Sequence, residues 1–499
     1  MLKVLILGVV MMAGASVFAQ RPVLKFDEPR VQQSMGHAYE HALANLLQIN
    51  VIPVRDGQKR SGLVTDPPGT FLRAGGDYQD PWTRDASVNS WSAISLLEPG
   101  LARNTLWAVC EKLPDGSTCV QNDNQWWDRV IWVTAAWNHY CTTGDRSFLT
   151  QAYDTSGRMI ADLTKTHFDT EYGLFRGPSH LQDGIAGYPP PFDDPAGTSS
   201  FVLDHPGSYE IMTLSVNCLY YEAFRCMAKM AEELGKGAGV ARDWNRRADV
   251  LRTTINERFW MPEAGSYAYL IYGVGDLRGM QAPYQEATGI SLAIMFGVPD
   301  EERARQVVEN VRTTKYGIPL VDPEFPRYTA EKPGRHSRIV WPLAQGYWAN
   351  AAAKVGNVAR FRTEVETLAN LAKSTDWDFM EIYNPTTGKP DGGWQCGSHW
   401  GSCTNQAWSA SAYVRMIHYG LFGMEFTPEG IELAPTLPSE WGGVSLSGLH
   451  YRDAVLDLRL TGSGRRVAKF TIDGKSSRKA LIPCGLTGKH TVEVVLAPG

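Results

Sequence analysis

Four acidic residues stand in the parts of the sequence best suited to chemistry. Asp85, Asp183, Glu286 and Glu381 lie in long connecting segments that are rich in aromatic, amide and charged residues. Hydrolysis of a glycosidic bond requires one carboxylic acid to protonate the leaving oxygen, and one carboxylate to activate water or to attack the sugar carbon. Two of these four residues could catalyse such a reaction if the fold brings them to one cavity.

The segment around Glu381 is the most specific signal in the chain. It reads Trp-Asp-Phe-Met-Glu-Ile-Tyr-Asn-Pro-Thr-Thr-Gly from Trp377 to Gly388. It resembles the Glu-x-Tyr-Asn/Asp-Pro-x-Thr-Gly segment of six-hairpin glycosidases, such as glycoside hydrolase family 63 and the mannosylglycerate hydrolase-like group. The resemblance implies that Glu381 is the catalytic base and that Tyr383 contacts substrate. The alternative is a glutamate that caps the turn between Tyr383 and Gly388.

Asp183 and Glu286 are the candidates for the general acid. The loop from Gly173 to Pro189 resembles the one that holds the acid in the same group, which implies that role for Asp183. Apolar neighbours could raise its pKa, and Tyr188 among them is also a candidate substrate-binding residue. The alternative is an ordinary Asp-Gly turn. Glu286 opens a predicted helix and is the reserve acid, although acidic residues in a first helical turn usually have an electrostatic role.

Further residues are candidates for binding sugar. The element Trp82-Thr83-Arg84-Asp85 resembles the Trp-x-Arg-Asp element of glucoamylase-like enzymes, which implies that Trp82, Arg84 and Asp85 hold a terminal sugar. An N-terminal helix cap with an ion pair is the alternative. The chain has 16 tryptophans, whose indoles can stack on sugar rings or fill a core. The remaining candidates are Trp126, Trp127, Arg335, His336, Arg338, Trp341, Gln406 and Trp408.

These residues require a scaffold that gathers their loops at one face. Apolar residues recur three and four positions apart from about residue 33 to 420, which predicts about twelve helices. They are expected near 33–49, 85–97, 99–112, 124–143, 146–167, 209–235, 240–258, 284–295, 300–313, 339–355, 358–374 and 404–419. The rich connections precede every second helix and span 78–85, 122–128, 173–209, 267–286, 331–341 and 376–406. Antiparallel helix pairs place alternate connections at the same end. We therefore expect a mainly α fold, an (α/α)6 toroid with its site at one mouth.

A change of pattern after Gly423 predicts a second domain. Leu456, Leu458 and Leu460 alternate with polar residues, and short strand-like runs are separated by glycine and proline turns. The tail from Glu425 to Pro438 is similar to the one that follows such barrels in rhamnosidases and sugar phosphorylases. The expected division is a signal peptide at 1–19, a catalytic (α/α)6 barrel at 20–423 and a small β-rich domain at 424–499.

The ends and the charge of the chain limit its location and partners. A lysine, an apolar run from Val4 to Met12 and small residues up to Ala19 have the layout of a cleavable secretory signal. We therefore expect a secreted or periplasmic protein without membrane insertion. The formal net charge of −5 argues against a nucleic-acid partner. The expected partner is a carbohydrate substrate. No cofactor and no metal ligands are predicted, and the sequence leaves open a structural cation such as calcium.

Two pairs among the eight cysteines are close in sequence. Cys110 and Cys119 flank a Pro-Asp-Gly-Ser turn, and Cys396 and Cys403 flank a Gly-Ser-His-Trp-Gly loop. Export would place both pairs in an oxidising compartment, so two local disulfides are expected. The alternative at the second loop is a metal site made of Cys396, His399 and Cys403.

These observations favour an exo-acting glycoside hydrolase, an inverting α-glycosidase that cleaves a terminal sugar from an oligosaccharide or polysaccharide. One alternative is a polysaccharide lyase on the same toroid, with Tyr188, His180, His205 or His336 as its base. The acidic balance does not favour the basic groove that a lyase acting on uronic acids often has. Another alternative is a glycan-binding protein that kept the fold and lost the chemistry.

Overall fold

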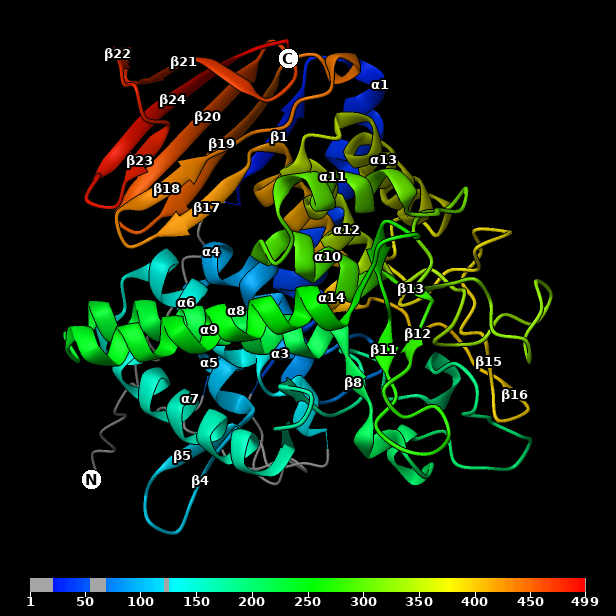
Figure 1. The fold of residues 1–499 in the computed structure, drawn as a ribbon. Helices are drawn as coiled ribbons and strands as arrows, with labels where there is room; N and C mark the ends of the chain where they lie inside the picture. The colour runs from blue at the N-terminus through cyan, green and yellow to red at the C-terminus, as the bar shows by residue number, and fades with distance from the viewer. Residues whose placement is uncertain (1–20, 54–68, 121–124, 499) are drawn as a thin grey trace, which may run out of the picture.

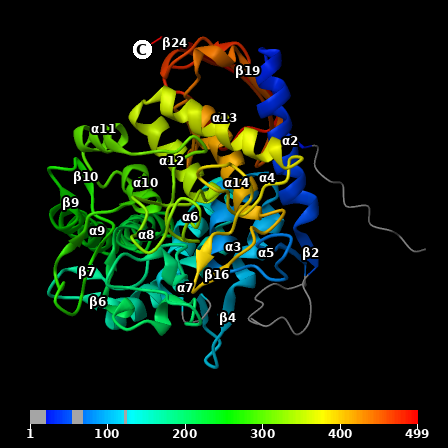
Figure 2. The same cartoon turned by 90° about the vertical axis from the view of Figure 1, so that its right-hand side faces the viewer.

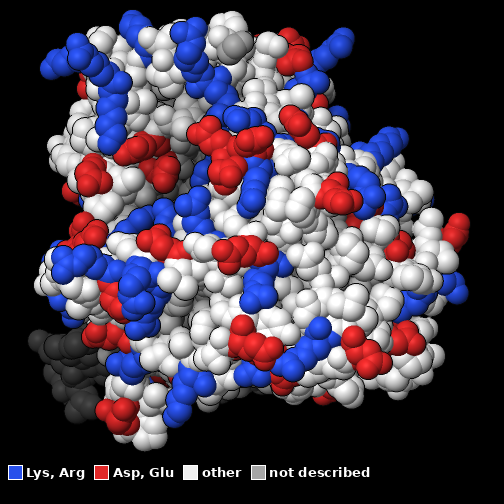
Figure 3. Space-filling model, in the orientation of Figure 1, with Lys and Arg blue, Asp and Glu red and all other residues white. Residues whose placement is uncertain are grey.

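The computed structural model describes residues 21–53, 69–120 and 125–498. Helices form the lower part of the molecule, and strands from the C-terminal region form a layer above them (Figure 1). The predicted signal peptide at 1–19 lies outside the described residues. Acidic and basic side chains are interspersed over the face shown in Figure 3.

Six inner helices form a closed ring. Each packs against the next one, and the last packs against the first. They are α3 (Thr83–Asn89), α6 (Ile131–Thr143), α8 (Leu214–Glu233), α10 (Ala287–Phe296), α12 (Pro342–Val355) and α14 (Ala407–Arg415). Every residue of α3 and α14 is buried, because these helices have neighbours on all sides. The mainly α toroid predicted from the sequence is confirmed.

The outer helices cover this ring with one apolar face. In α9 the buried residues Ala241, Ala248, Leu251 and Ile255 follow helical spacing, and most other positions are accessible. The outer helices are α2 (His37–Ala44), α5 (Pro99–Ala108), α7 (Arg146–His167), α9 (Ala238–Arg258), α11 (Glu301–Asn310) and α13 (Val358–Ser374). In the described ranges, no helix combines the length and hydropathy needed to cross a bilayer.

Several helices continue through π-helical turns. Helix α2 lies in a helical run with α1 (Pro29–Val31), η1 (Gln32–Gly36) and η2 (Asn45–Ile49). This run lies along one side of the molecule and reaches the C-terminal sheet (Figure 2). Helix α3 continues through η3 (Ser90–Ile94) into α4 (Ser95–Leu97), and α14 continues through η8 (Met416–Leu421).

The short joints between inner and outer helices follow from their residue types. Helix α6 ends at Gly144, which adopts φ 75°, and the side chain of Asp145 then accepts a hydrogen bond from the Phe148 backbone N–H at the start of α7. Helices α12 and α13 are joined in the same way by Gly356 and Asn357. A left-handed glycine that ends one helix and a capping side chain that starts the next make these turns tight.

Two sheets form the upper layer. A six-stranded sheet has the order β1-β19-β20-β24-β21-β22, and a three-stranded sheet has the order β17-β18-β23. Their bounds are β1 (Val23–Phe26), β17 (Met424–Thr427), β18 (Gly430–Leu433), β19 (Val444–Tyr451), β20 (Ala454–Thr461), β21 (Arg466–Ile472), β22 (Lys475–Ser476), β23 (Leu481–Pro483) and β24 (Gly488–Ala497). The expected division placed residues 23–26 in the barrel, whereas β1 pairs with β19 in the C-terminal sheet.

Short strand pairs and 3-10 turns lie within the loops. The strands are β2 (Val51–Pro53), β3 (Thr70–Leu72), β4 (Cys110–Lys112), β5 (Thr118–Val120), β6 (Phe168–Asp169), β7 (Leu174–Phe175), β8 (Met212–Thr213), β9 (Trp260–Met261), β10 (Ser266–Tyr267), β11 (Leu270–Ile271), β12 (Gln281–Ala282), β13 (Gln285–Glu286), β14 (Val321–Asp322), β15 (Trp394–Gln395) and β16 (Ser398–His399). The 3-10 turns are η4 (Trp126–Asp128), η5 (Ile185–Gly187), η6 (Val202–Asp204), η7 (Ser208–Glu210) and η9 (Ser439–Trp441).

The two expected disulfides are absent, and all eight cysteines are free. In the β4–β5 hairpin, Cys110 lies opposite Val120 and Cys119 lies opposite Glu111. This register places the two sulfurs on opposite faces of the hairpin. Cys396 and Cys403 have separate partners, since the first thiol donates to the Ser199 carbonyl and the second to the Tyr78 hydroxyl. No group of residues in the described part of the chain has the makings of a metal site.

We predict that a buried carboxyl between α12 and α13 makes stability depend on pH. Burial raises the pKa of Glu364 to about 7, against the hydrogen bond from Gln345. The neutral form is therefore favoured in the fold, and its stabilising contribution is complete below about pH 4.5 and lost as pH rises through about 7. Glu364→Gln should gain roughly 2–3 kcal/mol relative to the wild type between pH 4 and pH 8.

Urea unfolding of both proteins at the two pH values measures this difference. The matched control is Glu309→Gln, because Glu309 is an exposed residue of α11. Parallel pH dependence in the wild type and Glu364→Gln would contradict the prediction.

Candidate active site

A cavity of about 220 Å³ opens at one mouth of the helical ring. Its walls come from four of the six predicted rich loops, which precede α3, α8, α12 and α14. The lining residues are Tyr78, Trp82, Arg84, Asp85, Leu181, Asp183, Gly184, Ser200, Phe201, Arg335, His336, Trp341, Glu381, Gln395, Trp400, Gln406 and Trp408. The fold thus brings Asp183 and Glu381, the first-choice acid and base, to the same cavity.

Glu381 is buried and held by a cation and a hydroxyl. Its Oε2 accepts a hydrogen bond from Arg335 Nη2 at 3.0 Å, and its Oε1 accepts one from the Tyr78 hydroxyl at 3.1 Å. The guanidinium of Arg335 contacts the rings of Trp341 and Trp400, with its Cζ atom 5.6 and 5.3 Å from their centroids. These two contacts fix the orientation of the Glu381 carboxyl group, and positioning is what a general base requires first.

The turn that follows Glu381 is capped by another residue. Asn384 Oδ1 accepts hydrogen bonds from the backbone N–H groups of Thr386 and Thr387, at 2.9 and 3.0 Å. The alternative in which Glu381 caps this turn is therefore wrong. Tyr383 does not line the cavity: it is buried beside Val340, and its hydroxyl accepts a hydrogen bond from the Met380 backbone N–H. It positions the segment that carries Glu381.

Asp183 is partly exposed to the cavity. Its Oδ2 accepts a hydrogen bond from Gln125 Nε2 at 3.4 Å and lies 4.0 Å from Arg84 Nη1, and its Oδ1 lies 3.8 Å from His336 Nε2. Burial raises the pKa of Asp183 even though Arg84 opposes the shift. Burial also holds the pKa of His336 well below its usual value, so this histidine is neutral. A carboxyl with a raised pKa can keep a proton for donation.

Glycine follows Asp183 because the side chains of Gln395 and His336 lie too close to Gly184 for any other residue. A Cβ on Gly184 would lie 2.4 Å from both Gln395 Oε1 and His336 Cδ2, closer than real Cβ contacts. Leu181, just before, adopts φ 61°, a left-handed conformation that is strained for a leucine. Its N–H donates to Asp128 Oδ1 at 3.3 Å. Strain held by the surroundings is typical of residues that position a functional group.

Buried charges join this loop to α3. Asp128 accepts hydrogen bonds from Arg84 Nη1 and from His180 Nδ1, both at 2.8 Å. Burial works to raise the pKa of Asp128, but Arg84 and His180 outweigh it and the pKa is lowered. Asp128 is therefore an ionised anchor whose role is to hold Arg84 at the cavity.

Asp85 faces the cavity from the first turn of α3. It is buried, and burial raises its pKa to about 7 despite Arg84, with a further upward contribution from Glu381. Its Oδ2 lies 3.6 Å from Arg84 Nε, too far for a hydrogen bond. Asp85 therefore has an acceptor available for a ligand.

Other cavity residues also have buried polar atoms without a hydrogen-bond partner. Buried polar groups in folded proteins nearly always have partners, so such atoms gathered at one cavity indicate a polar ligand. The donors and acceptors concerned are Arg84 Nε, Asp85 Oδ2, His336 Nδ1, Gln406 Oε1 and Trp408 Nε1. Aromatic rings lie among them, with Trp341 and Trp408 in edge contact at 5.5 Å and Arg84 over Trp408 at 5.3 Å. Hydroxyl groups on a flat apolar ring would match this combination.

Glu286, the reserve acid, lies outside the cavity. It is fully buried and caps α10, where its side chain accepts hydrogen bonds from the backbone N–H groups of Thr288 and Gly289. Gln182 Nε2 also donates to it, at 3.2 Å. The geometry gives Glu286 a structural role rather than that of a proton donor.

Four predicted binding residues are also structural. Trp126 stacks on His167 at 4.3 Å and on Tyr209 at 5.5 Å, and Trp127 is fully buried. The Tyr188 hydroxyl donates to the Gln182 carbonyl and accepts from the Ser179 backbone N–H. Arg338 pairs with Asp322 at 2.9 Å. None of these four residues, Trp126, Trp127, Tyr188 and Arg338, is among the described residues that line the cavity.

Tyr78, Gln395 and Trp400 line the cavity and were not predicted. Trp400 is 41% exposed, a large exposed fraction for a tryptophan. Its place in a Gly-Ser-His-Trp-Gly loop was a usable signal, because an aromatic side chain in a glycine-rich loop has little core to fill. Tyr78 and Gln395 carried no such signal.

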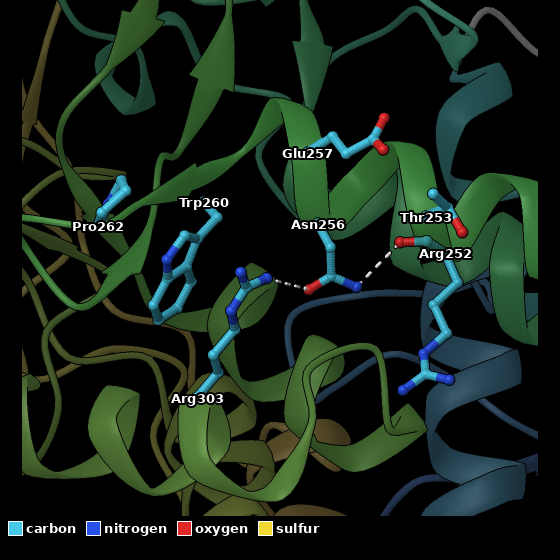
Figure 4. A pocket seen from close by; sticks show the side chains of 7 residues that line it. All are labelled: Arg252, Thr253, Asn256, Glu257, Trp260, Pro262 and Arg303. Atoms are coloured by element: carbon cyan, nitrogen blue, oxygen red, sulfur yellow. Dashed lines mark hydrogen bonds between the residues drawn. The ribbon is translucent and has the colours of Figure 1, made fainter.

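A larger hollow of about 480 Å³ lies on the outer surface, at the end of α9 (Figure 4). Asn256 and Arg303 are hydrogen-bonded to each other there, and Arg303 lies over Trp260 at 4.8 Å. Among the described residues that line it, Glu257 is the single carboxylate. This hollow therefore does not supply the two carboxyl groups that glycoside hydrolysis needs.

Comparison with protein families finds two matches. Residues 129–409 match the family model described as mannosylglycerate hydrolase MGH1-like glycoside hydrolase domain. Residues 424–476 match the C-terminal domain of glycosyl hydrolase family 65. A comparison with curated protein sequences finds no match. The first match includes Asp183 and Glu381.

Solved structures share the fold. A sialidase matches with a TM-score of 0.63 and 15% identity, over 87% of this chain and 37% of its own. The GH78 family rhamnosidase of Bacillus sp. GL1 matches with a TM-score of 0.56 and 14% identity, over 96% of this chain and 44% of its own. The neutral trehalase of Saccharomyces cerevisiae matches with a TM-score of 0.51 and 13% identity, over 77% of this chain and 80% of its own. The chain spans less than half the length of the first two, and at these identities the likeness shows the fold alone.

We predict that Glu286→Ala separates stability from catalysis. The substitution leaves the donors of Thr288, Gly289 and Gln182 without an acceptor, which should cost about 1–3 kcal/mol of unfolding free energy. Turnover of a glycoside substrate by the folded fraction should stay within a few-fold of the wild type. Thermal unfolding and kcat measure the two effects, and a hundredfold loss of kcat with unchanged stability would restore Glu286 as an acid.

Proposed function

The chain belongs to the mannosylglycerate hydrolase MGH1-like glycoside hydrolases, and from this premise we propose that it is an exo-acting, inverting α-glycosidase. It would remove a terminal sugar from an oligosaccharide or polysaccharide. The observation that carries the proposal is the pair of carboxyl residues on one cavity: burial raises the pKa of Asp183, and Glu381 is paired with Arg335.

In the proposed reaction Asp183 is the acid and Glu381 the base. Asp183 donates its proton to the glycosidic oxygen as the bond from that oxygen to the anomeric carbon breaks. Glu381 takes a proton from a water molecule, whose oxygen forms the new bond to the anomeric carbon from the opposite face. The products are a free alcohol and a sugar of inverted configuration. Inverting enzymes separate their two carboxyl groups by about 6.5–9.5 Å, which we expect here.

The size of the cavity supports action at a chain end. Its volume of about 220 Å³ lies below the roughly 300–1,000 Å³ of pockets that take drug-sized ligands. One sugar ring would fit between Trp82, Trp341 and Trp408, with its hydroxyl groups on Asp85 and Gln406. Trp400 would contact the next unit of the chain at the exposed side.

The setting of the reaction is part of the proposal. The N-terminal segment up to Ala19 supports export to the periplasm or the medium. The two carboxyl groups and water account for the reaction, so we propose that it uses no organic cofactor.

Glu381→Gln should lower kcat by roughly a hundredfold to ten-thousandfold on every glycoside that the wild type cleaves, because the amide cannot take the proton from water. Asp183→Asn should lose a similar factor on natural oligosaccharides and much less on aryl glycosides with acidic leaving groups, which need little protonation. A panel of aryl glycosides and oligosaccharides measures both variants, and NMR of the first-formed anomer measures the stereochemistry.

Each component of the proposal has its own contradicting outcome. A first-formed anomer of retained configuration would overturn inversion. Internal cleavage of a polysaccharide would overturn exo action. Unsaturated products that absorb in the ultraviolet would indicate elimination instead, and sugar binding without turnover of any glycoside would indicate a binding protein.

Asp85→Asn tests the hydroxyl-binding role. Because Asp85 Oδ2 has no hydrogen-bond partner in the protein, we expect it to accept a hydrogen bond from the terminal sugar. The amide has one oxygen acceptor instead of two, and this loss should lower kcat/KM by about 10-fold. The control is Asp80→Asn, outside the cavity walls, and equal effects of the two substitutions would contradict the role.

A further inference from the structure

A second cavity of about 350 Å³ lies at the other end of the inner helices, beneath the C-terminal sheet. Arg415 reaches it from the last turn of α14, whose first turn carries Trp408 of the catalytic cavity. Met424 and Phe426 of β17 also line it. Acidic and basic side chains gather along the seam between the sheet and these helices, where the surface is hollowed (Figure 3).

Arg415 is buried in this cavity without an acceptor. It is 3% exposed, and neither its Nε nor its Nη1 has a hydrogen-bond partner. Burial lowers the pKa of its guanidinium, and the groups that oppose the shift are the hydroxyls of Tyr419 and Tyr347 rather than a carboxylate. A buried, unpaired charge is costly and is normally paired with an opposite charge.

Aromatic rings fix the guanidinium and leave its hydrogen-bonding edge unused. The Cζ atom of Arg415 lies 3.9 Å from the centroid of Trp91, 4.5 Å from that of Tyr419 and 5.7 Å from that of Tyr347. Cation–π contacts stabilise the charge but do not replace in-plane acceptors for its N–H groups. Trp91 and Tyr419 both lie in π-helical turns, η3 and η8, which occur often at functional sites.

The remaining walls are suited to an anion. Four basic residues, Lys229, Lys354, Arg415 and Arg465, line the cavity against the two acidic residues Glu222 and Glu425. Glu222 is already paired with Arg225 at 3.0 Å. The buried Thr134 hydroxyl and Arg465 Nε add two further polar atoms without partners. The described walls thus carry a net positive charge and several unused donors.

We propose that this cavity binds a small oxyanion, a phosphate or a carboxylate, on the guanidinium of Arg415. The planar guanidinium matches the oxygens of either group with paired, charge-assisted hydrogen bonds. The volume of the cavity suffices for a ligand of this size. The site is separate from the proposed catalytic cavity and does not depend on the glycosidase proposal.

Calorimetric titration of the full chain with inorganic phosphate and, separately, with acetate tests the site. Sodium chloride keeps the ionic strength constant, so that only specific binding is measured. We expect saturable binding of at least one anion, and a thermal midpoint that rises with its concentration. Comparison of the two titrations shows whether the site prefers phosphate or carboxylate.

Three variants locate the binding. Arg415→Met should weaken it by about tenfold or more, since charged hydrogen bonds are lost. Its thermal midpoint without anion should match or exceed that of the wild type, because methionine removes an unpaired buried charge. Arg465→Met, at the less buried side, should also weaken binding. Arg335→Met removes a cation of the catalytic cavity and should leave binding unchanged.

The contradicting results are distinct. If the folded wild-type protein shows no saturable binding of either anion, the proposal is overturned. Binding that is as tight in the folded Arg415→Met variant as in the wild type would also overturn it. Binding that survives Arg415→Met and Arg465→Met but is lost in Arg335→Met would place the anion in the catalytic cavity, which also overturns it.

Discussion

The catalytic cavity depends on the hydrogen bonds that the buried carboxylate of Asp128 accepts. Asp128 accepts hydrogen bonds from Arg84 on α3, from His180 and, more weakly, from the Leu181 N–H in the loop that carries Asp183. Two chain segments that are distant in sequence thereby meet at one buried charge. Since a buried carboxylate without these donors would be unfavourable, the ion pair, the strained loop and the approach of Asp183 to Arg84 are stable only together.

The sequence predicted the scaffold better than the individual contacts. Helical spacing and the alternation of loop types were sufficient to predict the toroid. Burial of a helix face requires apolar residues at regular spacing, and this spacing is visible in the sequence. The motif at Glu381 and the element at Trp82 also led to cavity residues. Trp126, Tyr188 and Glu286 were not distinguishable in this way, because residue type does not tell whether a loop side chain turns toward the cavity or into the core. Tyr78 and Asp128 were missed since their partners are far away in sequence.

The inner helices connect two polar environments of different character. At the mouth, Asp85 and Gln406 offer acceptors that suit the hydroxyl groups of a neutral sugar. At the end beneath the C-terminal sheet, Arg415 offers donors that suit an anion. Helix α14 begins at the first environment and ends at the second, so a single helix positions side chains for both.

Strand β1, from the N-terminal part of the chain, completes the edge of the C-terminal sheet. Val23–Phe26 pairs with Val444–Ser447, so the two ends of the chain meet along one sheet. The paired residues are far apart along the chain, which makes this a contact of very high sequence separation. Without β1 this edge of β19 would be open to strands of other molecules. With β1 paired, the edge of the sheet is a strand of only four residues, and a short edge strand disfavours edge-to-edge aggregation.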